Sequence, residues 1–283
     1  MIAAPLVSAD QLAELVERDE VRVADTRWYL AEPDRGIAAY REGHIPGAVY
    51  VHLEQHLSGG DGPGRHPLPD REVFAASMGS LGFGDGDLIV AYDDRGGAIA
   101  ARLWWMLRDI GHDAVRVLDG GLPAWKAAGH PVTTEVPAVE PSIMTVGPSL
   151  TRTIDRENLA ESLGELTVVD ARSTARYRGD EEPIDPVAGH IPTAVNVPYE
   201  ENVDTKGRFL PERMLAARYK SVGARGPDTV VYCGSGVTAC HDALAMVVAG
   251  LDEPILYPGS WSDWVTADLP VVTGDEPGGV LPY

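Results

Sequence analysis

The residue best suited to chemistry in this sequence is a cysteine between a short apolar run and two glycines. Cys233 directly follows the apolar run 229–232, and the tripeptide 234–236 (Gly-Ser-Gly) separates it from a helical pattern near Val237. Glycines allow a tight turn in which several N–H groups point at one spot, and the helix N-terminus adds partial positive charge there. Such a site stabilises the thiolate, which is the nucleophilic form of cysteine. We therefore predict that Cys233 is a catalytic nucleophile.

The second cysteine has a different context. Cys240 lies inside the helical pattern, where we expect it to be buried as a small apolar side chain. With only two cysteines, a disulfide framework is excluded, and free thiols indicate a reducing compartment. The first ten residues lack the pattern of a signal peptide, and no stretch approaches the length of a membrane helix. We expect a cytoplasmic protein without a membrane partner.

Length and charge restrict the protein class. The 283 residues, 44% of them hydrophobic, predict two domains with buried cores. A net charge of -20 repels a phosphate backbone, so we expect no nucleic-acid partner. No Cys or His cluster has the spacing of metal ligands, so we expect no metal site.

The chain repeats itself. GHIPGAV begins at Gly43 and GHIPTAV at Gly189, an offset of 189 - 43 = 146. Three further pairs occur in the same order with similar offsets: 25–27 with 170–172, Tyr92 with Tyr232, and Trp125 with Trp264. One domain fold is therefore used twice. We place the domains at 1–132 and 150–283, joined by a linker at 133–149 that holds three prolines.

Each half alternates continuous apolar runs with helical patterns. This alternation predicts an α/β fold in which each domain has a parallel sheet with helices on both faces. Ligands of such sheets bind at the carboxyl ends of the strands, where Cys233 lies. The first half has Asp93 at the equivalent position, so we expect it to keep the fold without the nucleophile. In the first half the expected strands are 21–25, 88–92 and 114–118, and the expected helices are 71–82, 98–107 and 122–129.

Several motifs together resemble the tandem rhodanese family over residues 20–270. They are DTRWYL, both GHIP segments, DGGLPAW, DARSTARYRG, CGSGVTACH and PGSWSDW. The family has an inactive first domain and an active second one. The loop CGSGVTA resembles that of 3-mercaptopyruvate sulfurtransferases, whereas rhodaneses that prefer thiosulfate usually carry a basic residue in this loop.

The resemblance implies a two-step sulfur transfer without a cofactor. Cys233 would take a sulfur atom from 3-mercaptopyruvate as a persulfide. Cyanide, a small thiol or thioredoxin would then remove it. Two alternatives stay open: thiosulfate as the donor, or a sulfur-carrier protein loaded by a partner. A Cys-based phosphatase is disfavoured, because the arginine such enzymes place six residues after the cysteine is here Ala239.

The resemblance also implies roles for individual residues. Arg176 matches a substrate-binding arginine, but the second arginine usual in the mercaptopyruvate enzymes is here Asp185. Arg178 and Arg208 are candidates to replace the missing cation from neighbouring loops, although we expect Arg178 at the surface. Ser235 matches a serine proposed to polarise the substrate or relay protons, and His44 is a catalytic candidate from the first domain. The expected substrate-binding set is Arg172, Arg176, Gly234, Gly236, Val237 and Thr238, with Arg172 also expected to tie loops together.

Overall fold

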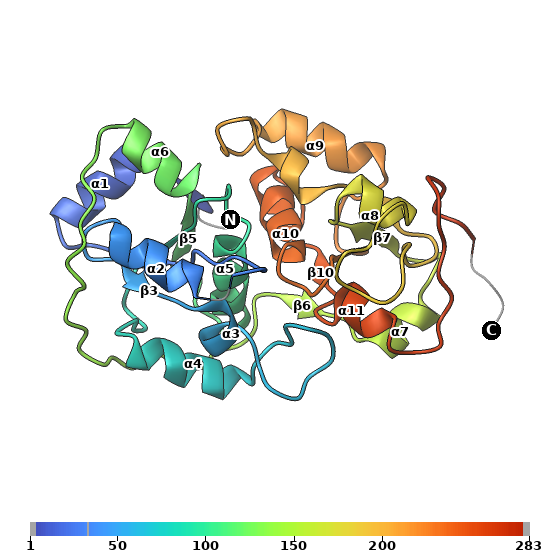
Figure 1. The fold of residues 1–283 in the computed structure, drawn as a ribbon, viewed down its shortest axis with the longest axis horizontal. Helices are drawn as coiled ribbons and strands as arrows, with labels where there is room; N and C mark the ends of the chain where they lie inside the picture. The colour runs from blue at the N-terminus through green and yellow to red at the C-terminus, as the bar shows by residue number, and fades with distance from the viewer. Residues whose placement is uncertain (1–3, 33, 280–283) are drawn as a thin grey trace. The chain divides into compact units, whose positions relative to one another are not determined.

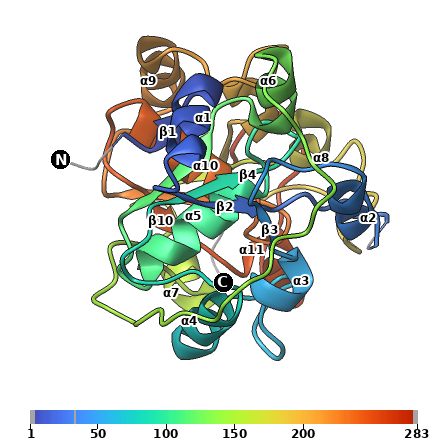
Figure 2. The ribbon, with the colours of Figure 1, turned by 90° about the vertical axis from the view of Figure 1, so that its left-hand side faces the viewer.

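The computed structural model describes residues 4–32 and 34–279, which form two compact units (Figures 1 and 2). Unit 1 contains the chain up to Gly59, together with Pro69–Leu150 and Val203–Phe209. Unit 2 contains Gly60–Leu68, Thr151–Asn202 and the chain from Leu210 onward. Each half of the sequence therefore contributes one short segment to the other unit.

The expected linker is an extended part of unit 1. Its first residues pair with the GHIP segment, since Thr133 N–H donates to His44 O over 2.9 Å. Further on, Ser142 N–H donates to Gly79 O over 2.9 Å, and Gly147 N–H donates to Ile110 O over 2.7 Å. These backbone bonds hold the segment on unit 1 up to Leu150.

Unit 1 is built on a five-stranded sheet with the strand order β1-β5-β4-β2-β3, and every pair is parallel. Its strands are β1 (Leu6–Val7), β2 (Arg22–Asp25), β3 (Val49–Tyr50), β4 (Ile89–Tyr92) and β5 (Val115–Leu118). Its helices are α1 (Ala9–Glu17), α2 (Arg35–Glu42), α3 (Leu53–His56), α4 (Arg71–Ser80), α5 (Ala100–Asp109) and α6 (Gly121–Ala127).

Unit 2 repeats this topology, with the parallel order β6-β10-β9-β7-β8. Its strands are β6 (Arg152–Thr153), β7 (Thr167–Asp170), β8 (Val195–Asn196), β9 (Thr229–Tyr232) and β10 (Ile255–Leu256). Its helices are α7 (Arg156–Glu161), α8 (Thr174–Arg178), the 3₁₀ helix η1 (Tyr199–Asn202), α9 (Glu212–Ser221), α10 (Ala239–Val248) and α11 (Ser260–Trp264). The predicted α/β fold with two parallel sheets is confirmed.

The central strands explain the continuous apolar runs in the sequence. All residues of β4 and β9 are buried, because each strand has a neighbour on both sides and helices pack against the sheet. The repeated tryptophans have the same role in both units. Trp125 Nε1 donates to Pro131 O over 2.8 Å, and Trp264 Nε1 donates to Pro270 O over 3.0 Å.

Among residues 4–32 and 34–279, no helix is both long and apolar enough to span a membrane. The same residues contain no group of His, Cys, Asp and Glu side chains arranged to hold a metal ion.

Candidate active site

Cys233 lies where the sequence predicted it, at the carboxyl end of a central strand. It follows β9 directly, and α10 begins six residues later at Ala239. Its side chain belongs to the buried interior, with 2% of the residue exposed. The loop 233–238 thus places a thiol between a parallel strand and a helix N-terminus, where binding sites of such sheets form.

The first turn of α11 fixes the shape of this loop. Cys233 N–H donates to Ser260 Oγ over 3.1 Å, and Trp261 N–H donates to Cys233 O over 3.0 Å. Gly236 is required where the loop passes Pro258: its φ is +76°, and a Cβ there would lie 2.4 Å from Pro258 O. The cysteine is therefore held on a rigid loop, as a nucleophile requires.

Arg172 connects three segments next to this loop. Its Nη2 donates to Asp170 over 2.6 Å and to Gly189 O over 2.6 Å, and its guanidinium lies 4.4 Å from the centroid of a Trp261 ring. Burial by itself lowers the pKa of this guanidinium, but the adjacent Asp170 carboxylate outweighs burial and raises the pKa above its ordinary value. With these partners in place, Arg172 supports the loops, which is the second of the two roles expected for it.

Two other guanidinium groups flank the residue after the nucleophile. A Cβ built on Gly234 would lie 3.2 Å from Arg65 Nη2 and 3.3 Å from Arg176 Nη1. Arg176, which the sequence predicted to bind the substrate, comes from α8, whereas Arg65 comes from the segment Gly60–Leu68. The loop with Cys233 therefore has two neighbouring cations suited to a carboxylate or sulfonate-like group.

Both cations are held by carboxylates of the loop that follows α8. Arg176 donates to Glu182 over 2.7 Å and to Asp185 Oδ2 over 3.1 Å. Arg65 Nη1 donates to the other oxygen of the same carboxylate, Asp185 Oδ1, over 2.7 Å. Asp185, the position of the missing second arginine, thus bridges the two arginines beside the nucleophile.

The two candidates for the missing cation have other surroundings. Arg178 pairs with Asp180 and Asp275 on an exposed surface, and Arg208 belongs to a segment of unit 1. Arg65 was not predicted from the sequence, although one signal was present. Residues 57–70 join α3 to α4 without regular structure, and long loops inside compact domains are often functional.

The same segment brings a histidine to the loop serine. His66 Nδ1 and Ser235 Oγ are 2.8 Å apart, and both residues are buried. A histidine paired with a hydroxyl can relay a proton. The sequence named Ser235 but not His66, because their sequence separation of 169 gives no local signal.

His44, the histidine proposed from sequence, is placed in unit 1. It is fully buried, with Nδ1 2.7 Å from Tyr40 O and Nε2 3.1 Å from Glu135 O. Its ring stacks on Tyr40, as that of His190 stacks on Tyr177 in unit 2. Both nitrogens therefore contact backbone oxygens, which favours a structural role and leaves His66 as the histidine at the candidate site.

The other loop residues have simpler environments. Gly234 O accepts a bond from Ser262 N–H over 2.9 Å, and Val237 is buried. Thr238 immediately precedes α10 as its N-cap. Cys240 is buried in the first turn of α10, and its thiol donates to Gly236 O over 3.3 Å. This is the apolar position that the sequence analysis expected for the second cysteine.

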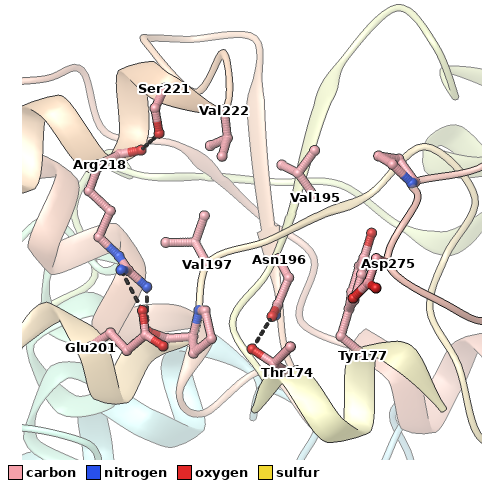
Figure 3. Close-up of a pocket in the computed structure, with 12 residues that line it drawn as sticks. Thr174, Tyr177, Val195, Asn196, Val197, Glu201, Arg218, Ser221, Val222 and Asp275 are labelled. Carbon is pink, nitrogen blue, oxygen red and sulfur yellow. Dashed lines mark hydrogen bonds and ion pairs between the residues drawn. The ribbon is translucent and has the colours of Figure 1, made fainter. Parts of the chain in front are cut away.

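A separate pocket of unit 2 runs along the edge strand β8 and has a volume of about 410 Å³ (Figure 3). On its walls Thr174 bonds Asn196, and Arg218 pairs with Glu201 (Figure 3). The lining includes no residue of the loop 233–238 and no nucleophile with a base. The cysteine loop is therefore the stronger candidate for an active site.

The arrangement around Cys233 can perform one kind of chemistry well. A buried thiol on a rigid loop is suited to nucleophilic attack. The two guanidinium groups can orient an anionic reactant against it, and the Ser235–His66 pair can move a proton nearby.

Comparison with known proteins gives a consistent result. The model of the rhodanese-like domain matches residues 8–128 and 155–267. The chain is 43% identical to a probable 3-mercaptopyruvate sulfurtransferase of Pseudomonas aeruginosa, over 97% of this chain and 100% of that protein. It is also 43% identical to a putative thiosulfate sulfurtransferase, SseB, of Mycobacterium tuberculosis, over 92% and 93% of the two chains. The solved structure of the 3-mercaptopyruvate sulfurtransferase SseA from Escherichia coli aligns with a TM-score of 0.81 and 31% identity, covering 92% of this chain and 100% of that one.

Proposed function

Since the chain belongs to the rhodanese family and is a sulfurtransferase, we propose that it takes sulfur from 3-mercaptopyruvate through a persulfide on Cys233. The support comes from the position of this residue, which is the cysteine on the loop at the carboxyl end of β9. In unit 1 the equivalent residue is Asp93, so the reaction belongs to unit 2.

In the first step the Cys233 thiolate attacks the sulfur of the donor. The new S–S bond forms as the C–S bond of mercaptopyruvate breaks, and the bonding pair stays on carbon as the enolate of pyruvate. The thiol proton of the donor ends on that carbon, which gives pyruvate and leaves an anionic persulfide. Backbone amides of the loop 233–238 would stabilise its negative charge, as an oxyanion hole does.

The hydrogen bond between Ser235 and His66 is the observation that carries the choice of donor. Sulfur leaves mercaptopyruvate only if a proton moves from the thiol to carbon, and a hydroxyl–imidazole pair can relay it. Thiosulfate needs no such transfer, because its S–S bond breaks to release sulfite directly. A proton relay beside the nucleophile therefore favours the keto acid.

Arg176 and Arg65 would hold the carboxylate of the donor. Both guanidinium groups lie beside Gly234, one residue from the nucleophile, and planar guanidinium groups bind carboxylates with two parallel hydrogen bonds. This binding mode orients the donor so that its sulfur faces Cys233.

In the second step an acceptor removes the outer sulfur. Cyanide attacks the persulfide to give thiocyanate and restores the Cys233 thiolate. A dithiol such as thioredoxin would release hydrogen sulfide and become a disulfide. Since the thiolate must be regenerated, we also propose a reducing compartment such as the cytoplasm.

Thiosulfate is the second candidate donor. The relative from Mycobacterium tuberculosis carries that name and is as similar to this chain as the Pseudomonas protein, at 43% identity. The loop 233–238 argues against it, because none of its side chains is basic and a dianion gains most from a cation beside the thiolate.

A kinetic comparison of the two donors tests the proposal, with cyanide as the acceptor at a fixed concentration. We expect a higher kcat/KM for 3-mercaptopyruvate. Intact-protein mass spectrometry after incubation with the donor should show one added sulfur atom that cyanide removes. A higher kcat/KM for thiosulfate would overturn the choice of donor. An adduct on Cys240, or one that persists in Cys233→Ser, would overturn the choice of nucleophile.

A further inference from the structure

Two arginines and two carboxylates form a group of ion pairs beside the nucleophilic loop. Glu182 also pairs with Arg172 over 3.4 Å, and the charge of Arg172 is balanced by Asp170. Glu182 and Asp185 are almost completely buried, with side-chain exposures of 4% and 5%, and Arg176 is 14% exposed. Arg65 is the most accessible member, at 27%. Because the carboxylates have little contact with solvent, their charge acts strongly on the neighbouring groups.

The charges in this group cancel. Arg65 and Arg176 contribute two positive charges, and Glu182 and Asp185 contribute two negative ones. Each oxygen of Asp185 accepts a bond from a different arginine, at 2.7 Å from Arg65 and 3.1 Å from Arg176. Asp185 therefore occupies Arg65 Nη1 and Arg176 Nη2, whereas Arg65 Nη2 and Arg176 Nη1 are the nitrogens nearest to Gly234.

The two carboxylates differ in their hydrogen bonds to the backbone. Glu182 Oε1 also accepts bonds from the backbone N–H groups of Ile184 and Asp185, both over 3.2 Å, so it shapes the loop itself. The carboxylate of Asp185 contacts the two guanidinium groups. Its negative charge is thus directed at the site, and its removal need not disturb the loop.

We propose that Asp185 sets the charge of the donor that this enzyme accepts, by favouring monoanions over dianions. The inference rests on the proposed function, since it assigns the specificity of the same site. A bound donor either lies against the Asp185 carboxylate or displaces it from the arginines. The repulsion grows with the charge of the donor, so a dianion such as thiosulfate is penalised about twice as strongly as the monoanion of mercaptopyruvate.

Asp185→Asn removes the charge and keeps the shape, so it is the direct test. We expect kcat/KM for thiosulfate to rise by about 10-fold and that for 3-mercaptopyruvate by no more than about 3-fold. The thiosulfate reaction should also become more sensitive to salt, because the group of charges then has a net positive charge. Asp180→Asn is the matched control: it removes the same charge from the same loop, where Asp180 pairs with Arg178 at the surface. It should leave the ratio of the two donors unchanged.

Asp185→Glu separates charge from packing. This variant keeps the carboxylate, so the donor ratio should stay within about 2-fold of the wild-type ratio. If Asp185→Asn does not fold, Arg65→Gln gives the opposite test, because it leaves a net negative charge and should lower kcat/KM more for thiosulfate than for mercaptopyruvate. Equal effects on the two donors in every folded variant would overturn the proposal, as would a shift towards mercaptopyruvate in Asp185→Asn.

A binding measurement separates this proposal from the choice of donor. Pyruvate and sulfate are unreactive anions of one and two charges, and each can protect Cys233 from alkylation by iodoacetamide. Asp185→Asn should strengthen protection by sulfate about 10-fold and protection by pyruvate much less. If the wild type prefers thiosulfate, the proposed donor is wrong. The change in protection by sulfate in Asp185→Asn still tests the role of Asp185. Unchanged protection by both anions would contradict the role of Asp185 alone.

Discussion

The loops that follow β4 in unit 1 and β9 in unit 2 occupy equivalent positions in the two units but begin with different residues. In unit 1 the carboxylate of Asp93, only 1% exposed, accepts four backbone N–H groups. In unit 2 the equivalent residue is Cys233, whose side chain can carry a transferable sulfur. The donors to Asp93 are Arg95 at 2.8 Å, Gly97 at 2.9 Å, Ile99 at 2.8 Å and Ala100 at 3.0 Å.

The framework beneath the two loops is the same. Tyr92 OH and Tyr232 OH each accept a backbone N–H of their GHIP segment over 3.2 Å. Arg27 and Arg172 each pair with the aspartate two residues before them over 2.6 Å. The difference between the units therefore lies in the loop and its neighbours. The loop binds a negative charge in both units: in unit 1 the charge belongs to the protein, and in unit 2 we propose that it belongs to the sulfur.

Cys233→Asp copies the unit 1 residue into unit 2 and should have the largest effect. The carboxylate cannot accept sulfur, so we expect turnover to fall by at least about 10⁴-fold. It should accept N–H groups of the loop as Asp93 does, and the variant should therefore melt at a higher temperature than Cys233→Ser. The measurements are turnover with 3-mercaptopyruvate and thermal unfolding. A variant less stable than Cys233→Ser would show that the two loops do not bind anions alike.

The helices after the two loops carry different buried ionisable residues at equivalent positions, Arg102 in α5 and Asp242 in α10. Burial raises the pKa of Asp242 from 3.8 to about 8. The folded state therefore favours the protonated acid. The stability that this group contributes is complete below about pH 4 and is lost as the pH rises through 8.

Asp242→Asn mimics the protonated acid, so the variant should not lose this stability as the pH rises. Its free energy of unfolding should exceed that of the wild type by an amount that grows between pH 5 and 8, by up to about 4 kcal/mol. Denaturant unfolding at several pH values measures this difference. A difference that is constant with pH would mean that Asp242 titrates alike in the folded and unfolded chain.

Asp93→Ala removes the buried carboxylate from the loop that follows β4 in unit 1. Four N–H groups, three of them buried, lose their acceptor, so we expect the free energy of unfolding to fall by about 3 kcal/mol. The folded fraction should keep its kcat/KM within about 3-fold, because the reaction belongs to unit 2. Asp34→Ala is a suitable control, since Asp34 is exposed and makes no capping hydrogen bond. Equal stability of the two variants would remove the structural role assigned to Asp93.

Arg176→Ala should have the smallest of these effects. It places in unit 2 the residue type found at the equivalent position of unit 1. Tyr40 and Tyr177 stack on equivalent histidines, and the residue before each tyrosine is Ala39 in unit 1 and Arg176 in unit 2. We expect kcat/KM to fall by about 10²-fold, and Arg176→Lys to recover only part of the loss. Arg178→Ala, on the same helix but paired at the surface, should leave the kinetics unchanged. Unchanged kinetics in a folded Arg176→Ala protein would move the anion site elsewhere.

The sequence alone predicted what depends on local pattern. Continuous apolar runs such as 229–232 indicated buried parallel strands, and the repeated GHIP segments indicated one fold used twice. The Gly-Ser-Gly loop placed Cys233 at a strand end, because tight turns and helix starts are encoded by neighbouring residues.

Only the tertiary structure decided which distant residues surround that cysteine. The segment Gly60–Leu68 carries no motif that links it to a loop 169 residues away, yet it brings His66 to Ser235 and Arg65 to Asp185. Likewise, nothing near Asp185 in the sequence shows that its carboxylate bridges two arginines. Local pattern encodes turns, strands and helices, whereas the pairing of charges across loops depends on how those elements pack, and so the partners of Cys233 became visible only in the folded chain.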